Sequence, residues 1–370
     1  MGRKSNTDPG YDLLILIPAL FLVALGLVFV FSASSPLGSE YRSDGLYYLK
    51  RQASFALLGI LALIAGKNIP PRLYGKLAYL IVAVTVGMLL MLFVPGFGVS
   101  VKGACRWLNL GFFSFQPSEV AKVALAVYMA YSMSKKGESM GTFSKGVFPH
   151  LFIASVFMGL ILMQPDLGTA VIIGCWAMTL MFIGGARIWH LGILVMTGIP
   201  FLVWGIYRAS YRVDRLVAFW DPWKHPESIG FQIIHSFLAF GSGGIFGAGF
   251  GGSKQKLFYL PEPHTDFILA VAAEEAGFLG VSLIIVLFAV LIIRGFKAGL
   301  ESRDVFSSYL ALGLVTMLGF QVLVNMGVVT SLLPTKGLTL PLISYGGSSL
   351  VINLFTIGIL LRVSSEKKRP

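Results

Sequence analysis

Long, unbroken apolar runs are the feature that most constrains how this chain of 370 residues folds. The hydrocarbon core of a bilayer is about 30 Å thick, and an α-helix crosses it with about 20 apolar residues. A water-soluble core would show shorter runs with polar faces. Suitable runs lie at 13–33, 50–66, 76–95, 118–134, 149–164, 168–185, 188–207, 266–293, 307–332 and 342–362. We therefore expect an all-α polytopic membrane protein with about ten transmembrane helices, formed by residues 1–370 as a single domain.

Composition and charge favour the same class. Only 12% of the residues are charged, whereas about a quarter are charged in a soluble domain. The net charge of +12 suits cytoplasmic loops, where Lys and Arg of membrane proteins gather. The sequence has no basic tract with interleaved aromatic residues, so we expect no nucleic-acid partner. The first run resembles a signal peptide, but its length and the later runs favour an uncleaved helix.

The distribution of Lys and Arg predicts the orientation. With the N-terminus inside, most basic residues of the short loops fall on the cytoplasmic side, as the positive-inside rule requires. Both termini are then cytoplasmic, and the outer segments are 34–49, 96–117, 165–167, 208–265 and 333–341. The long segment 208–265 separates the seventh and eighth helices. It is rich in aromatic residues, unlike a disordered linker, so we expect a folded or membrane-lying element that covers something.

Two other sequence features, the cysteines and a glycine-rich stretch, do not indicate a metal site or a nucleotide site. Cys105 and Cys175 lack the spacing of metal ligands, and both are interpreted as small packing residues. The glycine-rich stretch 241–252 suggests a dinucleotide-binding loop, but no βαβ unit surrounds it. We expect a flexible or close-packed loop whose bare backbone lets a lipid-linked ligand approach.

Polar residues gather on the outer side in the predicted topology. Ionisable groups near membrane depth are costly, and each is a candidate for function. The candidates are Glu119, Lys122, Asp166 and Asp266, with Arg106, Gln116, His264, Lys336, Ser344 and Tyr345 on the same side. Nothing comparable gathers on the cytoplasmic side. This one-sided convergence predicts a site that opens outward.

Each charged candidate has a structural alternative. Glu119 and Lys122 share a helix face, so they form either a structural ion pair or part of a site. Asp166 follows Gln164-Pro165 and suits a tight turn with a capping carboxylate. Asp266 begins a long apolar run, where it acts either as a helix cap or as a general base. We favour the role of Asp266 as a general base, because a helix cap requires neither His264 nor the rigid lead-in 261–263. His264 itself suits a hydrogen-bonding scaffold.

At several ordered motifs the sequence resembles the SEDS family of shape, elongation, division and sporulation proteins. The resemblance covers nearly the whole chain, and it rests on 102–108, 115–119, 164–169, 260–267 and 341–348. Segments 211–215, 218–223 and 333–339 favour the division branch of that family over the elongation branch. Cys105 departs mildly from the expected pattern. The N-terminal tail is also short, which leaves any partner contact of a longer tail in doubt.

The resemblance implies a peptidoglycan glycosyltransferase. Family members extend a nascent glycan strand from lipid II by a β-1,4 bond and release undecaprenyl pyrophosphate. They work with a class B penicillin-binding transpeptidase, FtsI-like in division, and with other divisome membrane proteins. This implies a multi-pass protein of the bacterial inner membrane, with its active site facing the periplasm or exterior.

The candidate residues suit an inverting transfer, which needs one base and a stabilised leaving group. We expect Asp266 to take the proton of the acceptor hydroxyl, while Arg106 and Lys122, with Lys336, offset charge on the pyrophosphate. Glu119 and Asp166 would hold the cations, and His264 and Ser344 would contribute to substrate binding. A divalent cation, Mg or Mn, would make Asp266 a metal ligand instead.

Two other classes of function remain open from the sequence. A lipid II flippase would use the same basic residues but requires a polar path to the cytoplasmic side. A non-enzymatic scaffold gives no reason for ionisable residues at membrane depth.

Overall fold

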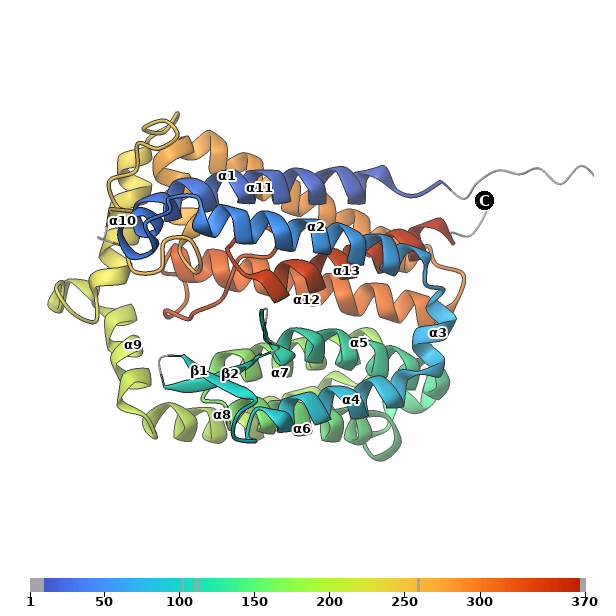
Figure 1. Cartoon of the computed structure of the whole chain (residues 1–370). Coiled ribbons are helices and arrows are strands. Elements are labelled where there is room, and N and C mark those ends of the chain that lie inside the picture. Colours follow the sequence, from blue (N-terminus) through green and yellow to red (C-terminus); the bar gives the residue numbers. More distant parts are fainter. Residues whose placement is uncertain (1–9, 102, 110, 112, 258–259, 367–370) are drawn as a thin grey trace, which may run out of the picture.

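The computed structural model describes residues 10–101, 103–109, 111, 113–257 and 260–366. Long helices lie side by side along one direction (Figure 1). Each predicted span coincides with a helix: α1 (Leu13–Arg42), α2 (Tyr47–Asn68), α4 (Ala78–Met91), α5 (Pro117–Lys136), α6 (Phe148–Leu162), α7 (Leu167–Ile183), α8 (Ile188–Tyr207), α11 (Ile268–Leu300), α12 (Val305–Val329) and α13 (Gly347–Ser365). Among the described residues, seven helices are long and apolar enough to cross a membrane, while α4 and α7 are apolar but shorter. The fold is that of a polytopic helical membrane protein.

The segment between α4 and α5 corrects the all-α expectation. Residues 96–117 hold a three-stranded antiparallel sheet of order β1-β2-β3, formed by β1 (Gly98–Val101), β2 (Ala104–Asn109) and β3 (Ser114–Phe115). Val99 pairs with Trp107, and Leu108 with Phe115; β-branched and aromatic residues of this kind favour strands. Gly103, with φ +77°, occupies the turn between β1 and β2, where glycine adopts positive φ without steric cost.

The long segment after α8 is folded, as its aromatic residues predicted. It contains the short helices α9 (Ser210–Trp220) and α10 (Phe231–Gly243), with a single turn, η3 (Pro222–Lys224), between them. The remaining connections hold α3 (Pro71–Lys76), η1 (Gly137–Gly141) and η2 (Phe143–Val147). α1 runs to Arg42, so it includes the first part of the loop expected at 34–49. In Figure 1, α9 and α10 lie at the end of the molecule opposite α3.

Close approaches between small residues hold the helices together. α13 packs along α2, and α12 packs against both α11 and α5. A Cβ atom on Gly358 would stand 2.2 Å from the carbonyl oxygen of Leu63, and one on Gly66 would stand 2.6 Å from that of Phe355. Small residues of this kind let the backbones of membrane helices touch. The indole nitrogen of Trp176 donates to the carbonyl of Gly313 at 2.8 Å and thereby links α7 to α12.

The long helix α11 is broken at Gly277, whose φ of 65° and ψ of −164° are not helical. The glycine-rich stretch inserts at this break. Its backbone N–H groups at Ala248 and Gly249 donate to the carbonyls of Glu274 and Glu275, at 2.9 and 3.0 Å. The stretch is therefore a close-packed loop that satisfies backbone groups left open by the break.

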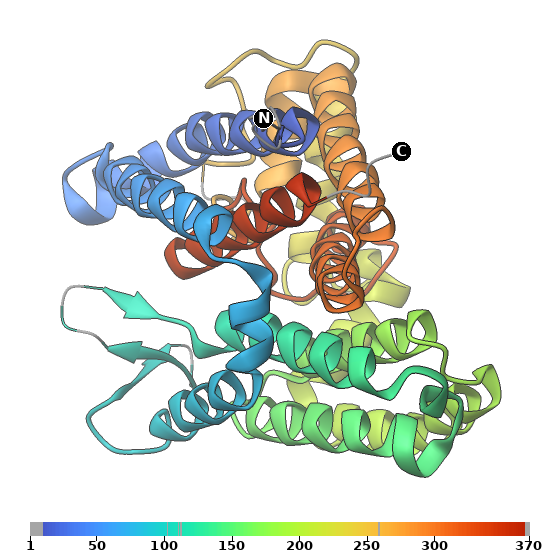
Figure 2. The same cartoon turned by 90° about the vertical axis from the view of Figure 1, so that its right-hand side faces the viewer.

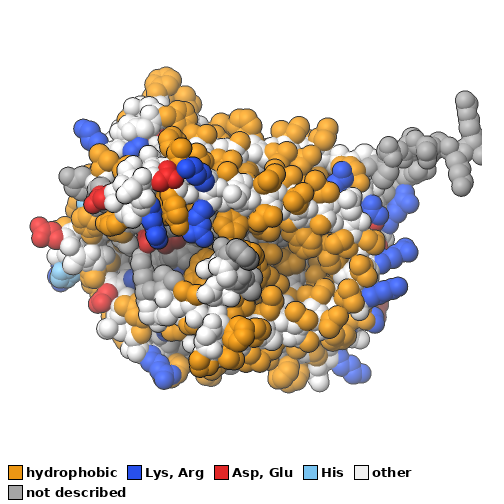
Figure 3. All heavy atoms as spheres, viewed as in Figure 1, with side chains coloured by type: hydrophobic (Ala, Val, Ile, Leu, Met, Phe, Trp, Pro, Cys, Tyr) orange, Lys and Arg blue, Asp and Glu red, His pale blue; other side chains and the backbone are white. Residues whose placement is uncertain are grey.

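The two ends of the bundle differ. Figure 2 looks along the helices from the end where both termini lie, with α3 in front and α4–α8 below α1, α2 and α11–α13. Figure 3 shows mostly Lys and Arg among the charged side chains at this end, Lys and Arg mixed with Asp and Glu at the opposite end, and a wide apolar surface over the middle. The opposite end carries the sheet and the loops before α11 and α13.

Candidate active site

Lys336 lies at the centre of the predicted charged cluster, in the segment between α12 and α13. Its ammonium nitrogen lies 3.9 Å from a carboxylate oxygen of Asp166 and 3.3 Å from the hydroxyl of Thr169. The charges of Asp166, Lys122, Arg106 and Asp266 all act on the pKa of Lys336. These five candidates therefore come together from segments up to 230 residues apart in sequence, which is the predicted convergence.

The turn before α7 presents Asp166 to this cluster. Its carboxylate accepts hydrogen bonds from the backbone N–H and the hydroxyl of Thr169, at 3.0 and 2.8 Å. Asp166 is therefore both a helix cap and the partner of Lys336, so its two interpretations hold together. The Lys336 side chain passes over Gly168, where a Cβ atom would stand 1.9 Å from the Lys336 Cε. A larger residue at position 168 would displace the Lys336 side chain from this path.

Arg106 fastens the sheet to the same turn. It lies on β2, and its guanidinium donates to the carbonyls of Gln164 at 3.1 Å and Pro165 at 2.7 Å. Arg106 thus holds the backbone that carries Asp166, in addition to any contact with an anion. Sequence separation hid this contact, because the two segments are almost 60 residues apart.

The surroundings shift the pKa values of Lys336 and of its partner Asp166 for different reasons. Burial lowers the pKa of Lys336 to about 7, although Asp166 opposes the shift. Burial by itself raises the pKa of Asp166, but Lys336 and Arg106, with the hydrogen bonds from Thr169, hold it below its usual range. Asp166 is therefore a carboxylate at neutral pH, whereas Lys336 titrates there.

Asp266 lies at the entrance of α11. The residue at the N-cap of α11 is Phe267, so Asp266 does not hold the capping position. A Cβ atom on Gly337 would stand 3.0 Å from the Asp266 Oδ2, which places the carboxylate next to the residue that follows Lys336. The Asn325 amide donates to the Asp266 carbonyl at 3.1 Å and fixes the backbone at this point.

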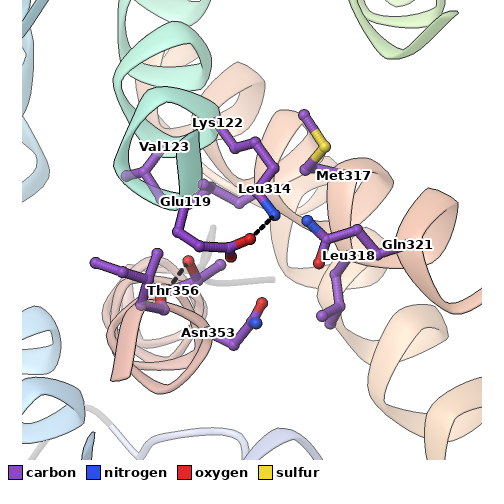
Figure 4. Close-up of a pocket in the computed structure, with 10 residues that line it drawn as sticks. Glu119, Lys122, Val123, Leu314, Met317, Leu318, Gln321, Asn353 and Thr356 are labelled. Atoms are coloured by element: carbon purple, nitrogen blue, oxygen red, sulfur yellow. Dashed lines mark hydrogen bonds and ion pairs between the residues drawn. The ribbon is translucent and has the colours of Figure 1, made fainter. Parts of the chain in front are cut away.

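Glu119 and Lys122 form an ion pair of 2.8 Å on α5, as their spacing predicted. They line a small, partly open pocket between α5, α12 and α13. Figure 4 shows the two side chains directed toward each other, with Gln321 and Asn353 beside them. The other walls are largely apolar: Val123, Leu314, Met317, Leu318 and Ile352, with Thr356. The pocket thus combines a charged pair with largely apolar walls.

His264 and Ser344 lie on the flank of the site that faces α2. The Ser344 hydroxyl donates to the Thr265 carbonyl at 2.6 Å and accepts from the Leu340 N–H at 2.8 Å. The Tyr345 N–H donates to the His264 carbonyl at 2.9 Å. These contacts position the backbone next to Asp266, so Ser344 orients the site through the main chain.

Two groups of polar residues escaped the sequence analysis. Gln52 on α2 is buried, and its amide bridges the Ser344 carbonyl and the Gly346 N–H; an isolated Gln gives no signal of such a role. The other group is ionic: Lys256 contacts Glu275 at 2.7 Å and the Ser32 hydroxyl at 2.9 Å. The Glu274 carboxylate accepts from the Lys254 and Gln255 N–H groups and the Ser253 hydroxyl.

Within the described part of the chain, no three His, Cys, Asp or Glu side chains are grouped so as to hold a metal ion. Mg²⁺ in enzymes is often bound by one or two carboxylates together with substrate phosphates. Asp266 by itself offers too few ligands, so a cation at this point would depend on phosphate groups of the substrate.

The comparisons with known proteins agree with this architecture. A family model described as a cell cycle protein of the FtsW, RodA and SpoVE type matches residues 12–369. The probable peptidoglycan glycosyltransferase FtsW of Geobacter metallireducens is 48% identical, over 97% of this chain and 96% of that protein.

Two solved structures share the fold over nearly the whole length. A chain from a peptidoglycan synthase complex, described as coordinating polymerization and crosslinking, is 32% identical and aligns with a TM-score of 0.77, over 96% of this chain and 98% of its own. The rod shape determining protein RodA of Thermus thermophilus is 29% identical, with a TM-score of 0.70 over 98% and 99%. The greater identity to FtsW confirms the division branch predicted from the sequence. The chain belongs to the FtsW, RodA and SpoVE family of cell cycle proteins.

Proposed function

We propose that this protein is a peptidoglycan glycosyltransferase that polymerises glycan strands during cell division. One observation carries the assignment to this site: the Asp266 carboxylate lies beside Gly337, while the neighbouring Lys336 meets Asp166 within a cluster of cations. A base and a cationic site for a leaving anion are therefore adjacent. An inverting transfer from a lipid pyrophosphate requires this combination.

In the proposed step, the 4-hydroxyl oxygen of the acceptor sugar bonds to the anomeric carbon of the donor. Its proton passes to the Asp266 carboxylate. The bond between that carbon and the phosphate oxygen breaks, and its electron pair leaves with undecaprenyl pyrophosphate. Lys336 and Lys122 stabilise the negative charge on this anion, and Arg106 supports them by holding the Asp166 turn in place.

We place the lipid end of the substrate at the pocket on α5, where α12 and α13 would have to move apart to admit a polyprenyl chain. Its Glu119–Lys122 pair is polar, and its apolar walls come from α12 and α13. In this arrangement the polyprenyl chain follows the apolar walls, and the pyrophosphate remains near Lys122. Figure 4 shows the charged pair at one side of the space and Leu318 and Met317 at the other.

We further propose that ten helices span the membrane, with both termini cytoplasmic. The basic side chains gathered at the terminal end support this orientation (Figure 3). It places Asp266 and Lys336 on the outer side, together with α9 and α10. Lipid II and the nascent strand are the proposed substrates. The proposed partner is a class B penicillin-binding transpeptidase of the FtsI type, with other divisome membrane proteins. A structural neighbour within a peptidoglycan synthase complex supports that partnership.

A reconstitution experiment tests the function. Purified protein, its cognate transpeptidase and lipid II in liposomes should yield glycan strands, detected by gel electrophoresis after the peptide cross-links are blocked with a β-lactam. A transpeptidase alone serves as the control. If the complex moves lipid II between leaflets but makes no strand, the flippase alternative replaces the polymerase.

Polymerisation should also depend on the titration of Lys336. Because the pKa of this residue is lowered to about 7, its positive charge is present below pH 7 and is lost as the pH rises through that value. We expect the rate to fall on the alkaline side of about pH 7. Lys336→Arg, whose guanidinium stays charged, should move this fall to higher pH. A wild-type rate that is flat from pH 6 to 9 would contradict the role of Lys336.

A further inference from the structure

An aromatic cluster lies beside residues 264–266, at the outer end of α2. The rings of Tyr48 and His264 have centroids 4.7 Å apart, and Tyr345 lies 5.3 Å from Tyr48 and 5.4 Å from His264. Tyr47 continues the cluster at 5.2 Å from Tyr48, edge to face. The three tyrosines are partly exposed and His264 is buried. The tyrosines of the cluster therefore present ring surfaces to solvent around His264, which lies two residues before Asp266 in the sequence.

Hydrogen bonds hold these rings in a fixed arrangement. The 264–266 backbone is bound to the turn before α13 through the Tyr345 N–H and the Ser344 hydroxyl. The buried Gln52 amide joins that turn to α2, by contacts of 3.1 and 3.3 Å. A binding surface whose side chains are already ordered costs less entropy when a ligand arrives. The rings are thus preorganised relative to Asp266.

Arg51 adds a positive charge to this surface. Its guanidinium lies 5.7 Å from the centre of the Tyr47 ring and donates to the Tyr47 hydroxyl at 3.0 Å. Among the residues that the structure describes, no carboxylate forms a salt bridge with Arg51. The remaining donors of the guanidinium suit a carboxylate of a ligand, in fork geometry.

We propose that Tyr47, Tyr48, Tyr345 and Arg51 form a sugar-binding subsite for a glycan that carries peptide stems. This inference rests on the proposed function. Exposed rings provide flat apolar surfaces for the C–H faces of a pyranose, with hydroxyl groups at their edges. Arg51 pairs with a carboxylate of the stem. The subsite holds the strand or the lipid-linked unit on the α2 side of Asp266.

Binding of a lipid-free probe tests the subsite without requiring turnover. The probe is a soluble tetrasaccharide of alternating N-acetylglucosamine and N-acetylmuramic acid with peptide stems, titrated into the purified full-length protein by calorimetry. Tyr48→Ala and Arg51→Gln should each weaken binding by about tenfold or more, as expected for losing a stacking or charge-assisted contact. Tyr48→Phe keeps the ring and should retain most of the affinity. A stem-free tetrasaccharide should lose the contribution of Arg51 but keep that of Tyr48.

Tyr79→Ala is the matched control. Tyr79 belongs to a similar aromatic cluster, 6.0 Å from Tyr128 and 5.7 Å from Tyr131. It lies at the start of α4, directly after α3, and α3 is at the end of the molecule opposite α9 and α10 (Figure 1). Tyr79→Ala should leave binding unchanged. Parallel titration with lipid II shows which ligand the subsite binds. If Tyr48→Ala and Arg51→Gln lose affinity only for lipid II, the subsite binds the lipid-linked unit. If they lose affinity for the tetrasaccharide, it binds the strand.

The result that would overturn the subsite is specific. If Tyr48→Ala and Arg51→Gln bind both probes as tightly as the wild type, the subsite is wrong even when the wild type polymerises lipid II. If the wild type binds the probes through these residues but makes no strand in the reconstitution, the polymerase function fails instead. Thermal unfolding of each variant separates lost binding from lost folding.

Discussion

Asp266→Asn is expected to lower the rate of glycan polymerisation by about 10²–10⁴-fold, the usual contribution of a positioned general base. Asparagine has nearly the same shape as aspartate but accepts no proton at neutral pH. The backbone at this point is held by Asn325 and Ser344, so the change should leave the fold intact. The measurement is the initial rate of strand formation in the reconstituted complex, together with the thermal midpoint of the variant.

The control lies in the long segment 208–265 that precedes Asp266. Asp214 is an exposed aspartate on α9, and Asp214→Asn should polymerise at the wild-type rate. Binding of lipid II should survive in Asp266→Asn, because the proposed cationic cluster is untouched. A variant that retains its rate would remove Asp266 as the base, and a variant that loses both rate and lipid II binding would indicate a role in substrate or metal binding.

Lys256→Met is expected to destabilise the protein by about 3–5 kcal/mol, the typical cost of removing one partner from a buried ion pair. The Lys256 and Glu275 side chains are 7% and 0% exposed, so the remaining carboxylate would lose its only described cation without gaining water. Unfolding in detergent, followed by circular dichroism, measures the effect. The rate of polymerisation should fall as well, because Lys256 binds the chain before Asp266 to Ser32 and Glu275.

Two further variants separate charge from packing. The double variant Lys256→Met/Glu275→Gln removes both charges and should recover a large part of the lost stability, since no uncompensated ion remains. Lys254 is exposed two residues earlier, and Lys254→Met should change stability by at most about 0.5 kcal/mol. If the double variant is as unstable as the single one, the ion pair is not the cause.

The sequence was sufficient for the features that depend on local spacing and hydropathy. The apolar runs predicted the helices because the backbone N–H and C=O groups of each run must form hydrogen bonds within the segment when no water is present in the membrane. The interval between Glu119 and Lys122 predicted their ion pair, because residues three apart share a helix face. The placement of polar residues at one end also followed, since alternating spans bring alternate loops to the same side.

Contacts between distant segments were beyond such reasoning. Lys336 meets Asp166 across 170 residues, and Arg106 binds the carbonyls of Gln164 and Pro165 from a strand. The short strands of the 96–117 segment were missed because strand formation depends on cross-strand partners as much as on composition. Glu274 and Glu275 are a different case. They lie in the apolar run 266–293, and the rule that selected Glu119 would have selected them too.

The break in α11 has a consequence for how the protein meets bilayers of different thickness. Before Gly277, residues 268–275 are all buried in protein, whereas Phe278 and Leu279 beyond it are 68% and 52% exposed. A membrane helix accommodates a thicker or thinner bilayer by tilting. An unbroken rod would transmit that tilt along its whole length to Asp266. With the break, we expect tilting of the part after Gly277 to reach Asp266 less directly, because the buried part before it packs against the protein by itself.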